Sequence, residues 1–268
     1  MAEKKLQLIL RDAGVESRRK AAEIVLEGRV TVNGQFVLDP AFLADPEKDH
    51  IKVDGKLLRP PAPEKYYFLF NKPRNVVSTM NDPEGRPCVG DLIKALKKNL
   101  FTVGRLDFDA EGLMILTNDG PVAHKISHPS GGVPRTYLVK VKGLPDDARL
   151  SSIRKGMSLG EGDRLGEVTW DVVKRQKTTT WIRIVLKEGK KNELKRIFFR
   201  IGHPVRKIRR VSFGPLALGT LPVGSWRPLT IAETAKLLAF AEQLETTPPP
   251  RRSRASRSTQ RRARAKKS

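Results

Sequence analysis

The chain has 268 residues, of which 38% are hydrophobic and 30% are charged, and its formal net charge is +23. This length supports one large domain, or a large and a small one, with enough core for both. The single cysteine excludes an internal disulfide, and with four histidines it offers no complete set of zinc ligands. No apolar run is long enough to span a membrane. We therefore expect a cytoplasmic protein without a metal site or a membrane partner.

The positive charge is unevenly distributed. Residues 1–62 are almost neutral, whereas residues 246–268 contain nine Lys or Arg and no Asp or Glu. Clustered positive charge indicates a polyanionic partner, because neutralised phosphates release counterions. Nucleic acid is favoured over a membrane surface, since the basic segments lack interleaved aromatics and an apolar face. Residues 246–268 cannot bury a core, so we expect a disordered basic tail that contacts phosphate.

Residues 1–60 predict a small α/β domain. Apolar residues at helical spacing indicate a helix from Leu6, and Ser17 is placed to cap a second helix. Residues 29–37 and 51–58 then indicate two hairpins, because each has an Asn-Gly or Asp-Gly pair at its centre. The prolines that follow predict a stiff linker at residues 61–65.

The stretch from Leu6 to Gly34 resembles the small RNA-binding domain first known from the fourth small-subunit ribosomal protein. The resemblance rests on the basic start of the second helix and on the segment Gly28-Arg29-Val30-Thr31-Val32-Asn33-Gly34. It implies that a local basic patch binds structured RNA, although an ordinary amphipathic helix pair would show a similar pattern. The residues expected in this patch are Arg11, Arg18, Arg19 and Lys20.

Residues 66–245 predict a larger domain. Strand and helix patterns interleave irregularly in it, which favours an α+β fold over repeated βαβ units. Strands are expected at 66–70, 113–116, 136–141 and 180–186, and helices at 90–99, 191–201 and 231–244.

Four carboxylates lie within one short segment of this basic chain: Asp107, Asp109, Glu111 and Asp119. Such a carboxylate is either an ion-pair partner, for instance of Arg105, or a reactive group presented to a polyanion. The spacing matches the first half of a calcium loop, but Asn118 stands where a bidentate glutamate is needed. A glycosidase pair of carboxylates is compatible with the spacing, yet a neutral sugar polymer does not explain the charge.

The segment Gly104-Arg105-Leu106-Asp107, followed by a turn predicted at residues 117–120, resembles the signature of ribosomal RNA pseudouridine synthases. Within that superfamily the chain is similar to the branch that contains synthase A of the small ribosomal RNA and synthases B, E and F of the large one. It is most similar to the synthase B type. Further matching blocks are Asn71-Lys72-Pro73, Asn81 to Pro87, Arg135 to Val139, Glu188 to Val205 and Gly214 to Arg227. The resemblance implies the pseudouridine synthase fold, a mixed or antiparallel sheet with flanking helices and a central cleft.

The resemblance also implies roles for single residues. Asp107 falls on the catalytic aspartate, Tyr137 on the tyrosine that packs against the target base, and Lys195 on the basic residue that pairs with the aspartate. Tyr137 is equally compatible with a strand aromatic that fills the core. A cation such as Lys195 beside Asp107 is expected to keep that carboxylate ionised.

Isomerisation of uridine to pseudouridine breaks the N1–C1′ bond, rotates the base and joins C5 to C1′. It needs no redox change, so no cofactor is expected. A carboxylate can attack the base, attack C1′ or begin a glycal route, and the sequence does not distinguish among these.

Residues 190–210 contain nine Lys or Arg against one acidic residue, Glu193. This predicts a wall that contacts phosphates, although part of it could form structural ion pairs. The expected members are Lys190, Lys191, Arg196, Arg206, Arg209 and Arg210. Arg105 is expected to fill the space left by a flipped nucleotide or to bind its phosphate.

We therefore expect a monomer that isomerises a specific uridine of ribosomal RNA, in the 23S large-subunit RNA. The alternatives that stay open are a non-catalytic RNA-binding or ribosome-assembly factor with the same fold, and the same chemistry on 16S ribosomal RNA or tRNA.

Overall fold

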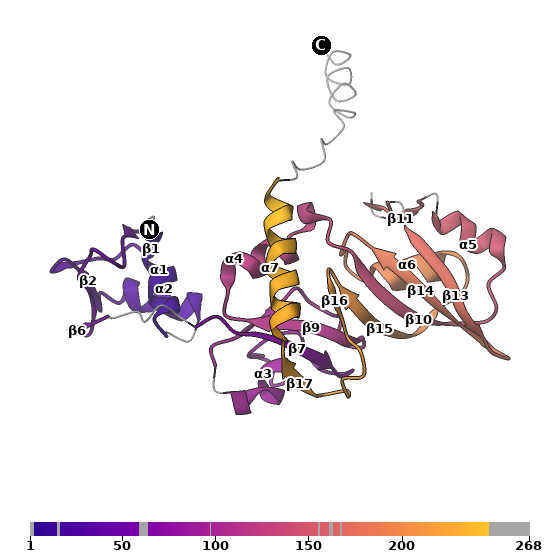
Figure 1. Cartoon of the computed structure of the whole chain (residues 1–268), viewed down its shortest axis with the longest axis horizontal. Helices are drawn as coiled ribbons and strands as arrows, with labels where there is room; N and C mark the ends of the chain where they lie inside the picture. The colour runs from indigo at the N-terminus through magenta and orange to yellow at the C-terminus, as the bar shows by residue number, and fades with distance from the viewer. Residues whose placement is uncertain are drawn as a thin grey trace, which may run out of the picture. The chain divides into compact units, whose positions relative to one another are not determined.

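The computed structural model describes residues 3–14, 17–58, 64–96, 98–154, 156–160, 163–166 and 168–246. These residues form two compact units (Figure 1). The first contains the described residues of Met1–Tyr66 and Leu96–Leu100, and the second those of Tyr67–Ala95 and Phe101–Ser268. The predicted linker at 61–65 and the predicted tail at 246–268 lie largely outside the described residues. In the described ranges, no helix is both long and apolar enough to cross a membrane.

The first unit contains two helices and a small sheet. Its helices are α1 (Leu6–Asp12) and α2 (Arg18–Leu26). The Ser17 hydroxyl accepts a hydrogen bond from the main-chain N–H of Lys20 at 3.1 Å, which confirms the predicted cap. Apolar side chains of both helices, including Leu10 and Val25, are fully buried against the sheet.

The sheet of the first unit confirms both predicted hairpins. Its order is β3-β2-β5-β6, formed by β2 (Val30–Val32), β3 (Gln35–Phe36), β5 (Ile51–Val53) and β6 (Lys56–Leu57). A separate pair joins β1 (Lys4–Lys5) to β4 (Leu43–Ala44). Asn33 and Gly34 have φ values of 52° and 85°, and Asp54 and Gly55 have φ values of 49° and 76°. Two consecutive positive φ values are what a two-residue hairpin turn requires.

The described part of the second unit contains a nine-stranded sheet. Its order is β13-β14-β10-β15-β9-β7-β17, with β16 paired to β15 and β8 paired to β9. The strands are β7 (Tyr67–Lys72), β8 (Phe101–Val103), β9 (Glu111–Thr117), β10 (Arg135–Lys142), β13 (Thr169–Arg175), β14 (Thr179–Leu186), β15 (Val205–Phe213), β16 (Leu216–Ala217) and β17 (Trp226–Pro228). Only the β9–β15 pairing is parallel among those described. The expected α+β class with a mixed sheet is therefore confirmed.

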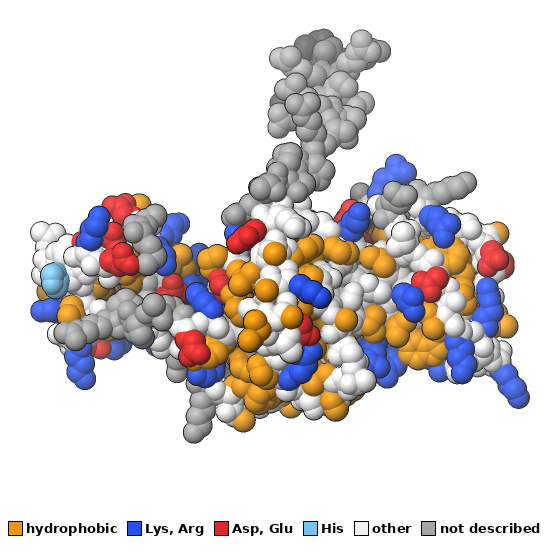
Figure 2. Space-filling model, in the orientation of Figure 1, with side chains coloured by type: hydrophobic (Ala, Val, Ile, Leu, Met, Phe, Trp, Pro, Cys, Tyr) orange, Lys and Arg blue, Asp and Glu red, His pale blue; other side chains and the backbone are white. Residues whose placement is uncertain are grey.

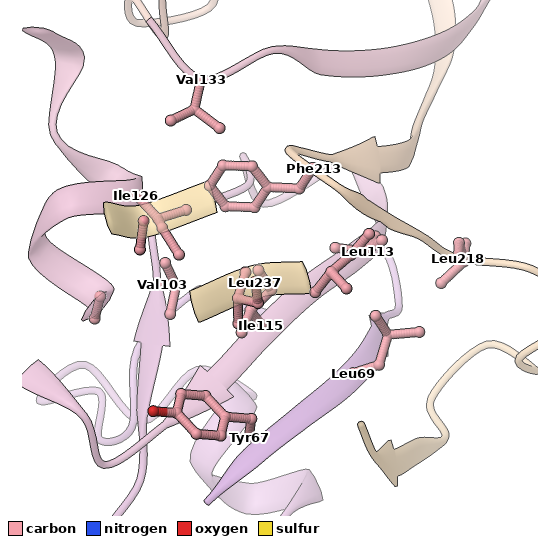
Figure 3. Packing of buried hydrophobic residues seen from close by; sticks show 13 residues of the cluster. Tyr67, Leu69, Val103, Leu113, Ile115, Ile126, Val133, Phe213, Leu218 and Leu237 are labelled. Carbon is pink, nitrogen blue, oxygen red and sulfur yellow. The ribbon is translucent and has the colours of Figure 1, made fainter. Parts of the chain in front are cut away.

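Helices pack on this sheet and enclose its main core. The described helices are α3 (Val89–Leu92), α4 (Gly120–Ser127), α5 (Asp147–Arg154), α6 (Glu193–Arg200) and α7 (Ile231–Thr246). Leu113 and Ile115 of β9, Ile126 of α4 and Leu237 of α7 belong to one buried hydrophobic cluster, which is drawn in Figure 3. Residues 113 and 115 share one face of the strand because side chains alternate along it. A short pair, β11 (Ser158–Gly160) with β12 (Asp163–Arg164), lies beside α6.

One local prediction is wrong. The helix expected at 90–99 ends at Leu92 and is followed by a 3-10 turn, Lys94–Leu96, because Ile93 has a φ of −115°, outside the helical region. The residues of the turn expected at 117–120 connect β9, which ends at Thr117, to α4, which begins at Gly120. Asp119 caps that helix, its carboxylate accepting a hydrogen bond from the N–H of Val122 at 3.3 Å.

Candidate active site

A pocket of about 310 Å³ opens in the second unit beside the loop between β8 and β9. Among the residues predicted for the site, its lining includes Arg105, Asp107, Tyr137, Lys190, Lys191 and Arg210. The structure therefore brings together residues from a loop, two strands and the segment before α6. On the face seen in Figure 2, Lys and Arg outnumber Asp and Glu over β13, β14 and α5.

The loop that carries Asp107 is fixed through its main chain. The Ser78 hydroxyl donates to the carbonyl oxygen of Leu106 at 2.6 Å, and the N–H of Asn75 donates to that of Phe108 at 2.7 Å. The Asp107 side chain is nevertheless exposed. The loop backbone is thus held by hydrogen bonds while the Asp107 carboxylate stays accessible at the pocket, which is the arrangement that a nucleophile requires.

Lys72 lies beneath this loop and is completely buried. Its ammonium donates to the carbonyl oxygens of Pro73, Asp107 and Ala110 at 2.9, 3.3 and 2.9 Å. Burial lowers the pKa of Lys72 to about 8, and the nearby carboxylates of Asp107 and Asp109 oppose that shift. Lys72 is thus a cation whose charge interacts directly with Asp107. The sequence offered only a weak signal for it, a lysine directly after the apolar run of a strand.

Tyr137 and Arg210 are neighbours on adjacent strands and both line the pocket. Arg210 is 1% exposed, and its Nε donates to the carbonyl oxygen of Leu113 at 2.7 Å. Burial lowers the pKa of Arg210, while the Tyr137 hydroxyl acts in the opposite direction. Arg210 is therefore a buried cation at the pocket and not an exposed one, and its predicted contact with phosphate stays a prediction.

Lys195 does not pair with Asp107, contrary to the prediction. Its ammonium lies 2.7 Å from a carboxylate oxygen of Asp109, and Lys195 is not among the residues that line the pocket. The reason is the turn of the loop, in which the N–H of Ala110 donates to the carbonyl oxygen of Asp107 at 3.1 Å. This turn lets the two carboxylates face different neighbours, the pocket for Asp107 and α6 for Asp109.

The predicted phosphate wall divides into exposed and internally bonded cations. Arg196 donates to a carboxylate oxygen of Asp163 at 2.8 Å and to carbonyl oxygens of β11, so its guanidinium is occupied within the protein. Arg209 is half-buried, with its Nε 4.0 Å from Glu111. The alternative of structural ion pairs therefore applies to these two arginines, and their predicted contact with phosphate stays a prediction.

Other predicted cations are accessible. Arg105 and Lys191 are exposed at the pocket, and Arg206 is exposed on β15. Lys190 is half-buried and forms an ion pair with Glu188 at 2.5 Å. Arg105 and Lys191 are thus exposed cations at the pocket, whereas Arg206 lies outside its lining.

The predicted patch of the first unit lies on its two helices. Arg18, Arg19 and Lys20 are exposed in the first turn of α2, and Lys20 pairs with Glu23 at 3.2 Å. Arg11, on α1, is half-buried beside Asp12. A contact between this patch and RNA stays a prediction. Among the described residues, no three His, Cys, Asp or Glu side chains are grouped as metal ligands would be.

Comparisons with known proteins agree with the motifs. The RNA pseudouridylate synthase family matches residues 66–199, and the S4 domain matches residues 4–51. The chain is 39% identical to "Uncharacterized RNA pseudouridine synthase" of Aquifex aeolicus, which covers 88% of this chain and 94% of that protein. It is 38% identical to "Ribosomal large subunit pseudouridine synthase B" of Bacillus subtilis, over 89% of this chain and 97% of that protein.

A solved structure shares the architecture. The crystal structure of a pseudouridylate synthase aligns with a TM-score of 0.63 and 27% identity, and the alignment covers 87% of this chain and 99% of the other. The resemblance predicted from the sequence is thereby confirmed. Because relatives above 30% identity match over almost their full length, the chain belongs to the RNA pseudouridylate synthase family and carries an S4 domain before its catalytic domain.

Proposed function

We propose that this chain isomerises a specific uridine of 23S ribosomal RNA to pseudouridine, with Asp107 as the catalytic aspartate. The observation that carries the assignment of the residue is that Asp107 and Tyr137, far apart in sequence, line one pocket. The target in the large ribosomal RNA is supported by relatives named "Ribosomal large subunit pseudouridine synthase B" at 38% and 35% identity. The S4 match supports a second contact with structured RNA.

The pocket fits a single extruded nucleoside. Its volume of about 310 Å³ is at the lower end of the range for ligand sites. A base inside a helix cannot offer C1′ and C5 to a side chain, so the target nucleotide must leave its stack. The aromatic face of Tyr137 would then pack against the base, and Arg105 would bind the flanking phosphate.

Two cations lie near Asp107 and Tyr137. The buried ammonium of Lys72 interacts with the Asp107 carboxylate, and Arg210 is the partner of Tyr137 on the adjacent strand. An ionised carboxylate can act as nucleophile or as base toward the sugar, splitting one difficult step into easier ones. Lys72 would position Asp107 without touching the substrate. We propose that the enzyme acts as a monomer in the cytoplasm, where it meets ribosomal RNA.

Two neighbouring aspartates provide a matched test. Asp107→Asn should abolish tritium release from ribosomal RNA that carries 5-tritiated uridine, while RNA binding is retained. Asp109→Asn makes the same chemical change two residues away and should retain activity within about tenfold, since its ion pair with Lys195 is partly exposed. Full turnover by Asp107→Asn would refute the catalytic assignment.

The substrate is tested separately. Pseudouridine mapping in cells that lack the gene should show loss at one 23S position, restored by the wild-type gene and not by Asp107→Asn. Loss confined to 16S ribosomal RNA or tRNA would contradict the 23S assignment and leave the chemistry intact.

A further inference from the structure

An aromatic ring stands exposed near the end of α6. Phe199 is 73% exposed, whereas Ile197 and Phe198 beside it are completely buried. The buried residues supply the helix with its core contacts, so the ring of Phe199 is not needed for packing. A single exposed apolar side chain is common and carries no meaning alone. For Phe199, the position on α6 and the charged residues around the ring indicate a function.

Helix α6 connects Phe199 to the active site. Its first two residues, Glu193 and Leu194, line the pocket. Lys195 is one turn before Phe199 on the same helix face and binds Asp109, two residues after Asp107. Phe199 follows Glu193 by six residues, which is about 9 Å along the helix axis. A stacked nucleic-acid strand covers that distance in two to three nucleotides, at about 3.4 Å each.

The charges around this helix suit a polyanion. Lys191 before α6, Arg200 at its end and Arg206 on the following strand are all exposed. Glu193, the acidic residue of the helix, is buried, while Asp109 and Glu188 are in ion pairs with Lys195 and Lys190. None of these three carboxylates is both exposed and unpaired, so they do not oppose the approach of phosphates to the ring. An apolar protein partner would have to bury these cations, at a desolvation penalty.

We propose that Phe199 stacks on an unpaired base of the RNA close to the target uridine, and that Lys191 and Arg200 bind the adjoining phosphates. Every base has an aromatic face, so such stacking adds affinity and orients the strand without reading its sequence. The inference rests on the proposed function of the pocket, from which the strand would continue along α6.

The test uses the full chain and three substitutions of Phe199. Phe199→Ala removes the ring, Phe199→Leu keeps an apolar side chain without an aromatic face, and Phe199→Trp enlarges the face. Binding to a 23S ribosomal RNA fragment and to a ten-residue oligouridine would be measured, with single-turnover tritium release at saturating RNA. Ala and Leu should both weaken binding about 5- to 100-fold, and Trp should bind as tightly as the wild type or more tightly. The saturating rate should stay within about twofold.

A matched control is available on α7. Ile231 is 92% exposed, so Ile231→Ala removes another exposed apolar side chain and should leave RNA binding unchanged. Wild-type binding by Phe199→Ala would overturn the proposal, and so would wild-type binding by Phe199→Leu, which would indicate a generic apolar contact such as a protein-docking surface. Absence of tritium release by the wild-type chain would refute the proposed function instead, and the binding series would still decide the role of Phe199.

Discussion

The buried ammonium of Lys72 holds the backbone of Asp107, donating to its carbonyl oxygen at 3.3 Å. The same ammonium donates to the carbonyl oxygens of Pro73 and Ala110, so the end of β7 is bonded to the loop at two residues, Asp107 and Ala110. A neutral amine has two hydrogens for these three acceptors and no charge to offer the carboxylate. The position of Asp107 is therefore coupled to the protonation of Lys72.

The first prediction concerns activity and pH. Because burial lowers the pKa of Lys72 to about 8, the rate at saturating RNA should fall as the pH rises through about 8. Lys72→Met should lower that rate at pH 7 by about 10- to 100-fold, the range expected for a loosened catalytic group, and should lack the step near pH 8. A tritium-release profile from pH 6 to 10 measures both. An unchanged profile in the Met variant would show that another group titrates.

The contribution of Lys72 to the stability of the protein should rise with pH, whereas its contribution to the rate should fall. The folded-state pKa of Lys72, about 8, lies below its ordinary value of 10.5. Between these values the unfolded chain binds more protons, so the contribution of Lys72 to the free energy of unfolding rises with pH. The wild type should gain up to about 3 kcal/mol relative to Lys72→Met from pH 7 to 10.5. Urea denaturation of both proteins at each pH tests this, and a constant difference would contradict it.

A glycine sets the spacing of the two strands that meet at the site. A Cβ on Gly112 would lie 2.2 Å from the carbonyl oxygen of Arg210, and Gly112 also has a φ of +116°. Gly219 has a φ of +59° with open space around it. Gly112→Ala should therefore destabilise the protein by more than about 3 kcal/mol, and Gly219→Ala by about 1 kcal/mol, since only the first adds a clash to backbone strain. Equal midpoints in urea denaturation would contradict the close approach.

Local signals predicted the local structure well. The turns at Asn33-Gly34 and Asp54-Gly55 and the cap at Ser17 depend on neighbouring residues, and the structure has them where the sequence placed them. Strand β15 was not predicted, because its basic residues concealed the alternation of buried Ile208 and Arg210. A buried arginine is stabilised by carbonyl oxygens from distant segments, which no local pattern reveals.

The sequence predicted which residues lie at the pocket, but not which of their side chains form ion pairs or hydrogen bonds with one another. Asp107 and Tyr137 lie at one pocket, as the resemblance implied. Lys195 pairs with Asp109 and not with Asp107 because of the way in which one loop turns. The sequence does not reveal this, since both residues are aspartates and lie only two positions apart. Lys72 was missed as a positioning residue because its role comes from three carbonyl oxygens assembled by folding.

The ion pair of Lys195 with Asp109 should contribute little to stability or activity. The two side chains are 36% and 42% exposed, and pairs of this kind contribute about 0.2 to 1 kcal/mol. A double-mutant cycle with Lys195→Met and Asp109→Asn should give a coupling energy in that range, and Lys195→Met should retain activity within about tenfold. A loss as large as that of Asp107→Asn would indicate that Lys195 moves to Asp107 when RNA binds.

Acid should weaken the start of α7. Glu233 accepts hydrogen bonds from Arg227 through both carboxylate oxygens at 2.7 Å, and with Thr230 it forms a reciprocal cap. The hydrogen bonds from Arg227 lower the pKa of Glu233 to about 2, so its contribution is complete above its ordinary value of 4.5 and disappears as the pH falls toward 2. Glu233→Gln should destabilise the protein by about 1 to 2 kcal/mol at pH 7, a range reduced for partial exposure, and by much less at pH 2, where about half of the Glu233 carboxyls are protonated. Urea denaturation of the two proteins at both pH values checks this, and a deficit of the same size at both would show that the loss comes from the shape of the side chain and not from its charge.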